Sequence, residues 1–158
     1  MFREMRRKPQ ALTEEECVKV LTEQTRGVLS VQGDDGYPYG VPINHYYNPD
    51  DGHLYFHGGK TGHRVDAVRA DDKASFCCYD EGYINEGDWA LNVKSVILFG
   101  RIRIVEDLEK TLDISRRLCY KFTDDEDYIR FTLEHSGPGT LLMEFIPEHM
   151  TGKLVNEK

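Results

Sequence analysis

The sequence predicts a mainly β protein, a small antiparallel β-barrel with helices at its periphery. At least six segments have strand composition, and most are joined by tight turns rich in Gly, Asp and Asn. The chain has 158 residues, 39% of them hydrophobic and 30% charged, which suits one domain with its own core. We therefore expect a single domain over residues 1–158, with residues 1–12 forming a basic N-terminal tail.

The charge balance argues against several classes of function. Lys and Arg total 20 against 28 acidic residues, so the net charge is -8, whereas non-specific nucleic-acid binding needs a basic surface. The short basic cluster at the N-terminus is interpreted as a solvated tail. No apolar stretch reaches the ~18 residues of a membrane span. The four cysteines form no C-x-x-C motif and no apolar leader is visible, so we expect a cytoplasmic protein with reduced thiols.

The first third of the chain predicts a helix followed by a hairpin. Thr13 and Glu16 form a capping box, so a helix should begin there and end before Gly27. Residues 27–32 and 39–47 are interpreted as two strands joined by the turn at 33–36. Pro42 lies inside the second strand and has no N–H to donate. That strand should therefore be an edge strand, carry a bulge, or turn that side toward a ligand.

The rest of the chain alternates strands with short helices. The expected elements are a strand at 53–57, a helix at 61–69, a strand at 73–79, a loop at 80–90, a strand at 91–106, a helix capped by Asp107, a helix at 128–134 and a last strand at 140–146. The centre of the long strand, residues 95–99, is apolar on both faces. This pattern indicates the barrel interior on one side and a subunit interface on the other. Trp89 is interpreted as a core or interface anchor.

The segment from His57 to Arg64 has the composition of an anion-binding site. Its glycines allow close approach of a ligand, and the N–H groups at the start of the following helix lack internal partners. Lys60, His63 and Arg64 would add positive charge, and Thr61 a hydroxyl. Such a site could hold the single phosphate of flavin mononucleotide (FMN). A plain glycine turn with solvated cations accounts for the same residue types equally well.

Residues of this region also partly match two other kinds of site. Gly59, Lys60 and Thr61 match the end of a nucleotide P-loop, but the glycine required five positions before Gly59 is Leu54, so NTP hydrolysis is not expected. The histidines nearby have no metal-ligand spacing, and no metal site is predicted. A single histidine acting as axial haem ligand stays open as an alternative.

Four segments together resemble the pyridoxamine 5'-phosphate oxidase-like flavoproteins, and most closely their nitroimidazole-resistance (NimA-like) branch. The first is the run from Gly36 to Tyr47, which resembles the second-strand motif of these proteins. The others are the phosphate-binding segment with its flanking strands, the long strand around residues 95–101, and the tail at 148–153. The resemblance covers roughly residues 13–153, and the joint order of the four segments is more specific than any one of them.

The resemblance implies an FMN-binding split barrel that works as a homodimer, with FMN at the subunit interface. By position, Pro42, Ile43 and Asn44 would lie along the isoalloxazine ring, and Ser95 would make a polar contact to the flavin. The phosphate and ribityl chain would be surrounded by His57, Lys60, His63 and Arg64.

The implied activity is an FMN-dependent oxidoreductase that reduces a small electron-poor molecule such as a nitro compound, with NAD(P)H as electron donor. The substrate-phosphate residues of the oxidase proper are not visible in this chain, so oxidation of pyridoxamine phosphate is not expected. No catalytic side chain is predicted, because the flavin performs the redox chemistry. Two alternatives use the same fold: a flavin- or haem-binding protein without turnover, and a structural dimer whose pocket binds nothing.

Overall fold

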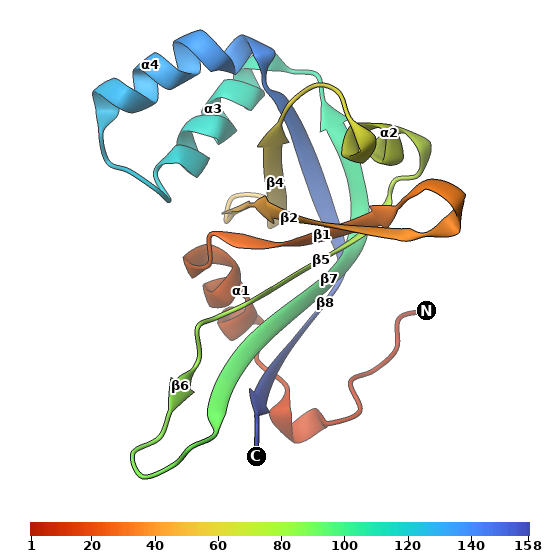
Figure 1. Ribbon diagram of the computed structural model, residues 1–158, viewed down its shortest axis with the longest axis vertical. Helices are drawn as coiled ribbons and strands as arrows, with labels where there is room; N and C mark the ends of the chain where they lie inside the picture. Colours follow the sequence, from red (N-terminus) through yellow and green to blue (C-terminus); the bar gives the residue numbers. More distant parts are fainter.

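A single curved antiparallel sheet forms the centre of the protein in the computed structural model, which describes residues 1–158 (Figure 1). The strands follow one another around the sheet in the order β2-β1-β5-β7-β8-β4-β3, and the short strand β6 pairs with β7. Their bounds are β1 Arg26–Gln32, β2 Pro38–Asn44, β3 Tyr46–Asn48, β4 His53–Gly58, β5 Lys73–Tyr79, β6 Tyr83–Ile84, β7 Leu91–Val105 and β8 Leu141–Asn156. The predicted mainly β fold with peripheral helices is confirmed.

The sheet is curled so far that its two opposite edges are joined by consecutive segments of the chain. β2 lies at one edge and β3 at the other, and only His45 separates them in the chain. The expected continuous strand at 39–47 is therefore wrong at this residue. His45 is fully buried, its Nε2 lies 2.8 Å from the carbonyl oxygen of Leu21, and its ring packs against Phe76. The chain thus crosses from edge to edge through the interior.

The core and the outer surface of the sheet follow the alternation of the strands. On β7, Val96 and Leu98 are buried, whereas Ile97 and Phe99 are 43% and 42% exposed. The apolar centre of this strand therefore faces the core on one side and leaves the other side exposed. Pro42 lies on the edge strand β2, as its missing N–H predicts. Trp89 is 72% exposed, so within one chain it is not a core residue.

Three helices pack on the sheet, α1 Glu14–Glu23, α2 His63–Ala70 and α3 Leu108–Cys119, and a fourth, α4 Glu126–Ser136, packs on α3. The capping box of α1 is present, and the Asp107 side chain accepts the N–H of Lys110 at the start of α3. α2 begins two residues later than predicted, because Gly62 has φ +120°, which a helix cannot contain. Since Asp125 caps α4, that helix is longer than the predicted 128–134. None of the helices is both long and apolar enough to cross a membrane.

The last strand and the N-terminal residues differ most from the expected pattern. β8 continues well past the predicted end at Ile146, because its second half pairs with β7 as far as Asn156. The N-terminal residues run beside this half of β8. Ala11 bridges Lys153, and the N–H of Leu12 donates to the carbonyl of Gly152 at 2.9 Å.

Candidate functional site

A hollow of about 410 Å³ opens where the end of β2 approaches β4, and it is lined by Arg26, Pro42, Ile43, Asn44 and His57. Pro42 to Asn44 come from the edge strand β2, and His57 comes from the other half of the sheet. The curl of the sheet brings these residues of β2 and β4 close together. Four of the predicted cofactor-binding residues are therefore brought together in one place.

Arg26 belongs to this hollow but was not predicted from the sequence. Its Nε donates to Oδ1 of Asn44 at 2.9 Å, and the two residues are direct partners in the β1–β2 pairing. Side chains of directly paired residues lie on the same face of a sheet. Counting back from the predicted turn at 33–36 would have placed Arg26 opposite Ile43, because the observed loop between Gln32 and Pro38 is one residue longer than that turn. The hollow therefore carries a fixed positive charge beside the Asn44 amide.

The guanidinium group of Arg64 packs against Gly58, the last residue of β4, just before the glycine-rich segment. The Nε atom of Arg64 is buried and has no hydrogen-bond partner. A Cβ at Gly58 would collide with the guanidinium group, whereas Cβ atoms at Gly59 and Gly62 would meet nothing within 4 Å. Buried polar atoms normally have a partner. An open backbone beside an unsatisfied guanidinium is therefore the arrangement that an anionic group would complete.

His57 stands between the hollow and this segment. Burial first, and then the nearby positive charge of Arg64, lowers the pKa of His57. The imidazole is therefore neutral at physiological pH, and it can donate from one ring nitrogen while accepting at the other. It adds no charge to the site, so the cationic character comes from the arginines.

The remaining predicted residues of the segment flank Arg64. The ammonium group of Lys60 donates to the carbonyl oxygen of Pro138 at 2.8 Å, which ties the loop to the turn after α4. Thr61 is exposed. His63 stacks on Tyr39 of β2, with ring centroids 4.1 Å apart, and its Nε2 lies 3.7 Å from a carboxylate oxygen of Asp34. Tyr39, which the sequence reasoning missed, thus fixes the start of α2 against the edge strand.

Ser95 does not line this hollow. It borders a separate cavity of about 210 Å³ with residues of β7, β8 and the N-terminus. The strand pairing nevertheless puts it on the same sheet face as Pro42. Direct partners across successive strands run from Pro42 through Val28, Cys77 and Ile97 to Thr151, and Ser95 lies two residues from Ile97. Within one chain, Ser95 therefore lies on the same face of the sheet as the hollow but lines a different cavity.

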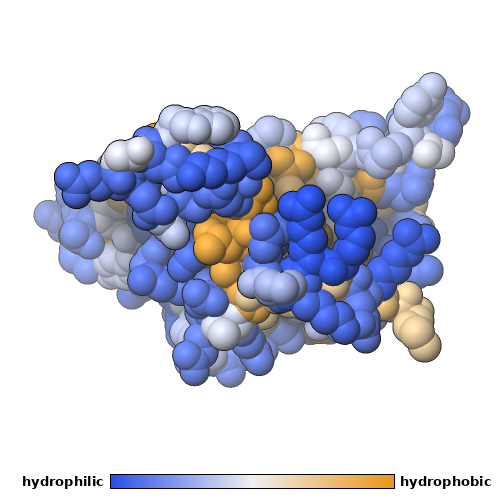
Figure 2. Space-filling view, turned by 90° about the horizontal axis from the view of Figure 1, so that it is seen from below, coloured by the Kyte–Doolittle hydropathy of each residue, from blue (hydrophilic) through white to orange (hydrophobic).

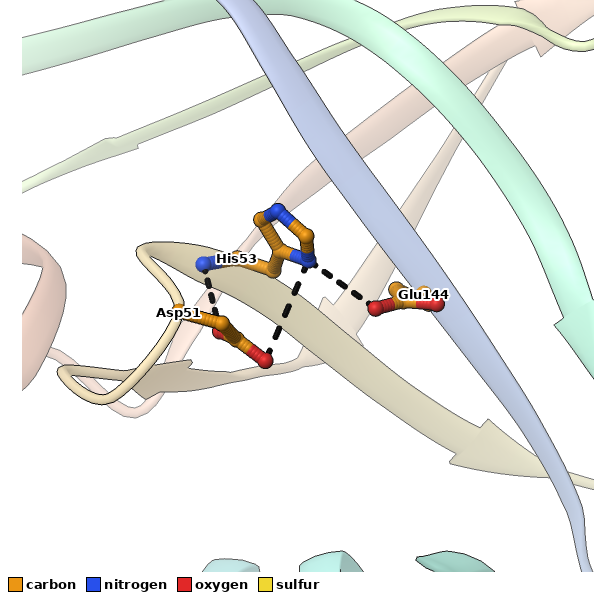
Figure 3. A group of neighbouring side chains, drawn as sticks. All are labelled: Asp51, His53 and Glu144. Carbon is orange, nitrogen blue, oxygen red and sulfur yellow. Dashed lines mark hydrogen bonds and ion pairs between the residues drawn. The ribbon is translucent and has the colours of Figure 1, made fainter. Parts of the chain in front are cut away.

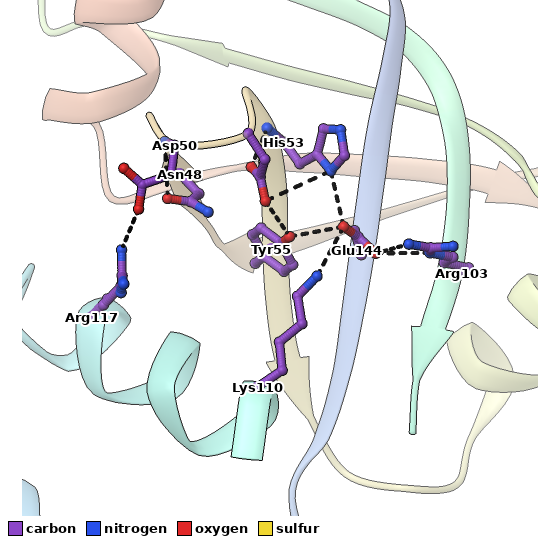
Figure 4. A network of polar contacts seen from close by, with 9 residues as sticks. Asn48, Asp50, His53, Tyr55, Arg103, Lys110, Arg117 and Glu144 are labelled. Carbon is purple, nitrogen blue, oxygen red and sulfur yellow. Dashed lines mark hydrogen bonds and ion pairs between the residues drawn. The ribbon is translucent and has the colours of Figure 1, made fainter. Parts of the chain in front are cut away.

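A second polar cluster lies at the other end of β4. Ligand-type atoms of Asp51, His53 and Glu144 lie within 4.8 Å of one another (Figure 3). Glu144 is 2% exposed, and its carboxylate is already surrounded by donors (Figure 4). Their distances are 2.7 Å from Arg103 Nε, 2.8 Å from the Tyr55 hydroxyl, 2.9 Å from His53 Nδ1 and 3.2 Å from Lys110 Nζ.

The charges of this cluster identify it as an ion-pair network. Burial alone would raise the pKa of Glu144, but the hydrogen bonds from its neighbours outweigh burial and lower the pKa to about 2. Because Arg103 and Lys110 already balance the charge of the carboxylate, it needs no further cation. The network joins β4, β7, β8 and α3, and its role is structural.

Comparison with known proteins gives a consistent result. Residues 13–154 match the family described as pyridoxamine 5'-phosphate oxidase. A solved structure of a candidate 5-nitroimidazole antibiotic resistance protein from Bacteroides thetaiotaomicron has 16% identity and a TM-score of 0.75, covering 92% of this chain and 87% of its own. No curated protein matches the chain significantly.

Two further structures share the fold. A FAD-binding protein from Mesorhizobium loti is 24% identical, with a TM-score of 0.64, and the match covers 92% of this chain and 97% of that one. A FAD and haem binding protein from Mycobacterium smegmatis is 16% identical, with a TM-score of 0.69 and coverages of 92% and 73%. At these identities the likeness shows the split-barrel fold.

Proposed function

The chain belongs to the pyridoxamine 5'-phosphate oxidase family, and from this premise we propose that it is an FMN-dependent oxidoreductase acting on a small electron-poor molecule. Membership of the family and flavin-binding proteins of the same fold support a flavin cofactor. The specific choice of FMN, of a nitro-type acceptor and of NAD(P)H as donor is our proposal.

The observation that carries the proposal is the buried, unpartnered Nε of Arg64 beside an open glycine backbone. Because no protein group holds the guanidinium, a phosphate monoester could bind it through its terminal nitrogens. The N–H groups at the start of α2 add donors, since the N-cap residue Gly62 has no side chain to satisfy them. One terminal phosphate matches one guanidinium and one helix start better than a longer polyphosphate does.

The residues of the hollow would then hold the ring system. When bound, FMN supplies hydride transfer. Pro42 cannot donate a backbone hydrogen bond, so this part of the edge strand offers an apolar surface to a flat ring. The Asn44 amide, held by Arg26, can bind a polar edge of the ring, and the side chain's orientation is fixed by the 2.9 Å hydrogen bond. No acid–base side chain is required by this arrangement.

A homodimer with the flavin at its interface is the assembly that we propose. The exposed face of β1, β2, β5 and β7 bears Pro42, Ile97 and Phe99, and the helices α3 and α4 lie at the other end of the sheet (Figure 1). Figure 2, which looks at the lower end of the molecule in Figure 1, shows apolar side chains exposed as a strip between polar ones. A second copy that covers the face bearing Pro42 and Ile97 would bring its own Ser95 toward the flavin of the first.

The absorption spectrum of the purified protein tests the proposal. We expect flavin absorbance that bleaches when NAD(P)H is added without oxygen and returns with a nitroaromatic acceptor. Arg64→Ala should yield protein with little flavin, whereas Arg69→Ala, an exposed arginine at the other end of α2, should keep it. Flavin content equal in the two variants would contradict the proposed phosphate site.

A second candidate is a flavin- or haem-binding protein without turnover. It is favoured by His57, because the lowered pKa keeps this imidazole in the neutral form that ligates haem iron. One structural neighbour is described as a FAD and haem binding protein. A Soret band that disappears in His57→Ala would support this candidate, and NAD(P)H-dependent bleaching of a flavin would argue for the oxidoreductase.

A further inference from the structure

Lys121 lies in the turn after α3, and its ammonium group contacts two connections of the chain at once. Its Nζ donates to the carbonyl oxygen of Gln24 at 2.6 Å and to that of His45 at 3.0 Å. Gln24 is the C-cap of α1, two residues before β1 begins, and His45 is the only residue between β2 and β3. One side chain therefore links α3 to both the α1–β1 and the β2–β3 connection.

These two connections lead directly into the hollow. Arg26 and Asn44 are the last paired residues at this end of β1 and β2. Just beyond them the N–H of His45 donates to the carbonyl oxygen of Thr25 at 3.2 Å. From there one segment leads back to α1 and the other leads on to β3. Lys121 thus holds the end of the β1–β2 pairing, next to the Arg26–Asn44 hydrogen bond that lines the hollow.

The end of α1 depends on other elements for its hydrogen bonds. The carbonyl groups that end a helix lack internal partners and favour a nearby positive charge, but the last turn of α1 contains no basic residue. The imidazole of His45 contacts the carbonyl of Leu21, and Lys121 contacts that of Gln24. No backbone N–H donates to the carbonyl of Gln24 or His45, so Lys121 is the donor on which both depend.

The charge of Lys121 can be removed without a substitution. Burial lowers its pKa to about 8, while Cys78 of β5 acts in the opposite direction. The two titratable groups that face it keep their charge state near this pH, because burial lowers the pKa of His45 to about 4 and raises that of Cys78 to about 12. Lys121 is therefore charged at pH 7 and mostly neutral at pH 9, where its hydrogen bonds to the two carbonyls are weaker.

We propose that Lys121 is a positioning residue of the flavin site, which fixes the end of β2 and the Arg26–Asn44 pair where the flavin ring would lie. Lys121 does not line the hollow, so it acts on the ring only through the backbone that it holds. Its removal should weaken binding of the ring and leave phosphate recognition by Arg64 unchanged. This inference rests on the proposed function.

Titration of the ligand-free protein with riboflavin and with FMN, followed by flavin fluorescence, tests the inference. Riboflavin has the ring without the phosphate. Lys121→Met removes the donors and should weaken binding of both flavins about tenfold, so the ratio of the two affinities stays constant. Arg64→Met should change that ratio, because only FMN has a phosphate to lose. Lys19→Met, at an exposed lysine of α1, is the matched control and should bind as the wild type does.

Unchanged riboflavin affinity in Lys121→Met, or a loss confined to FMN, would overturn the inference. The pH profile of the wild type is a second measurement that requires no substitution. Riboflavin affinity should fall about threefold from pH 7 to pH 9 as Lys121 loses its charge, and Lys121→Met should show no such fall. A flat profile in the wild type, or the same slope in both proteins, would also overturn it.

Hydrogen exchange of the ligand-free protein separates this inference from the proposed function. In Lys121→Met the amides of residues 43–46 should exchange about tenfold faster, whereas those of β4 and α2 should be unchanged. Faster exchange in this segment, in a protein whose wild type binds neither flavin, would refute the flavin site while Lys121 still positions the end of β2. Flavin binding with unchanged exchange and unchanged ring affinity would refute the role of Lys121 and leave the proposed function intact.

Discussion

Two polar sites lie at the two ends of β4. At one end every buried charged group has a partner, and at the other end one buried charged group has an atom without a partner. Near His53 and Tyr55, the Glu144 carboxylate lies within hydrogen-bond distance of four side chains. Next to His57 and Gly58, Arg64 buries a nitrogen with no acceptor. A saturated network stabilises the fold by itself, whereas an incomplete one indicates a ligand. The predictions below test this difference.

Removing the Glu144 charge should have the largest effect. In Glu144→Gln, Arg103 and Lys110 lose the carboxylate that both contact. Breaking a fully buried ion pair costs about 3–5 kcal/mol, and the cost is at the low end here because the Arg103 and Lys110 side chains stay 63% and 36% exposed. We expect the free energy of unfolding to fall by about 3 kcal/mol, measured by urea denaturation. Glu148→Gln, on the same strand but 43% exposed, is the control and should change little. Equal effects in both variants would remove the distinction between the two ends of β4.

Acid should weaken the same network next. The pKa of Glu144 is lowered from an ordinary 4.5 to about 2, so as pH falls the unfolded chain binds the proton before the folded protein does. The stabilisation is complete above pH 4.5 and is lost between pH 4.5 and 2, on the order of 3 kcal/mol. Stability of the wild type and Glu144→Gln, measured at several pH values, should converge over this interval. Parallel curves would contradict the assignment of the lowered pKa to this carboxyl.

Removing the Arg64 charge should reduce binding and spare the fold. Arg64→Met keeps much of the side-chain volume and removes two or more charge-assisted hydrogen bonds to a phosphate, so FMN should bind about 100-fold more weakly. The unfolding free energy without FMN should not decrease, because the buried Nε has no partner to lose. Quenching of flavin fluorescence measures the affinity, with Arg69→Met as the control. A large loss of stability without FMN would make Arg64 a structural residue.

The smallest effect is expected at Lys60. Its ammonium is exposed and already donates to the carbonyl of Pro138. Lys60→Gln should therefore weaken FMN binding only about threefold, as expected for a partly screened charge. The same titration measures it. A loss as large as that of Arg64→Met would mean that Lys60 leaves Pro138 and binds the phosphate directly.

Several features of the molecule were determined by short stretches of sequence. Thr13 with Glu16 and Asp107 mark helix starts because a capping side chain bonds to a backbone N–H only three residues away. The edge position of Pro42 and the burial of alternate residues around Val96 follow from the same local rules. The glycine and cation pattern from His57 to Arg64 also lay within one segment and could be read directly.

Other features were decided only by the tertiary structure. Glu144 meets His53, 91 residues away in sequence, because β4 pairs with β8, and no local pattern encodes that pairing. The break at His45 depends on the curl of the whole sheet, which brings its opposite edges β2 and β3 close enough for one residue to connect them. Capping and alternation act over a few residues, whereas strand order and register arise from burying the whole core at once. The sequence therefore determined the kinds of residues at each site, and the closing of the sheet determined which of them meet.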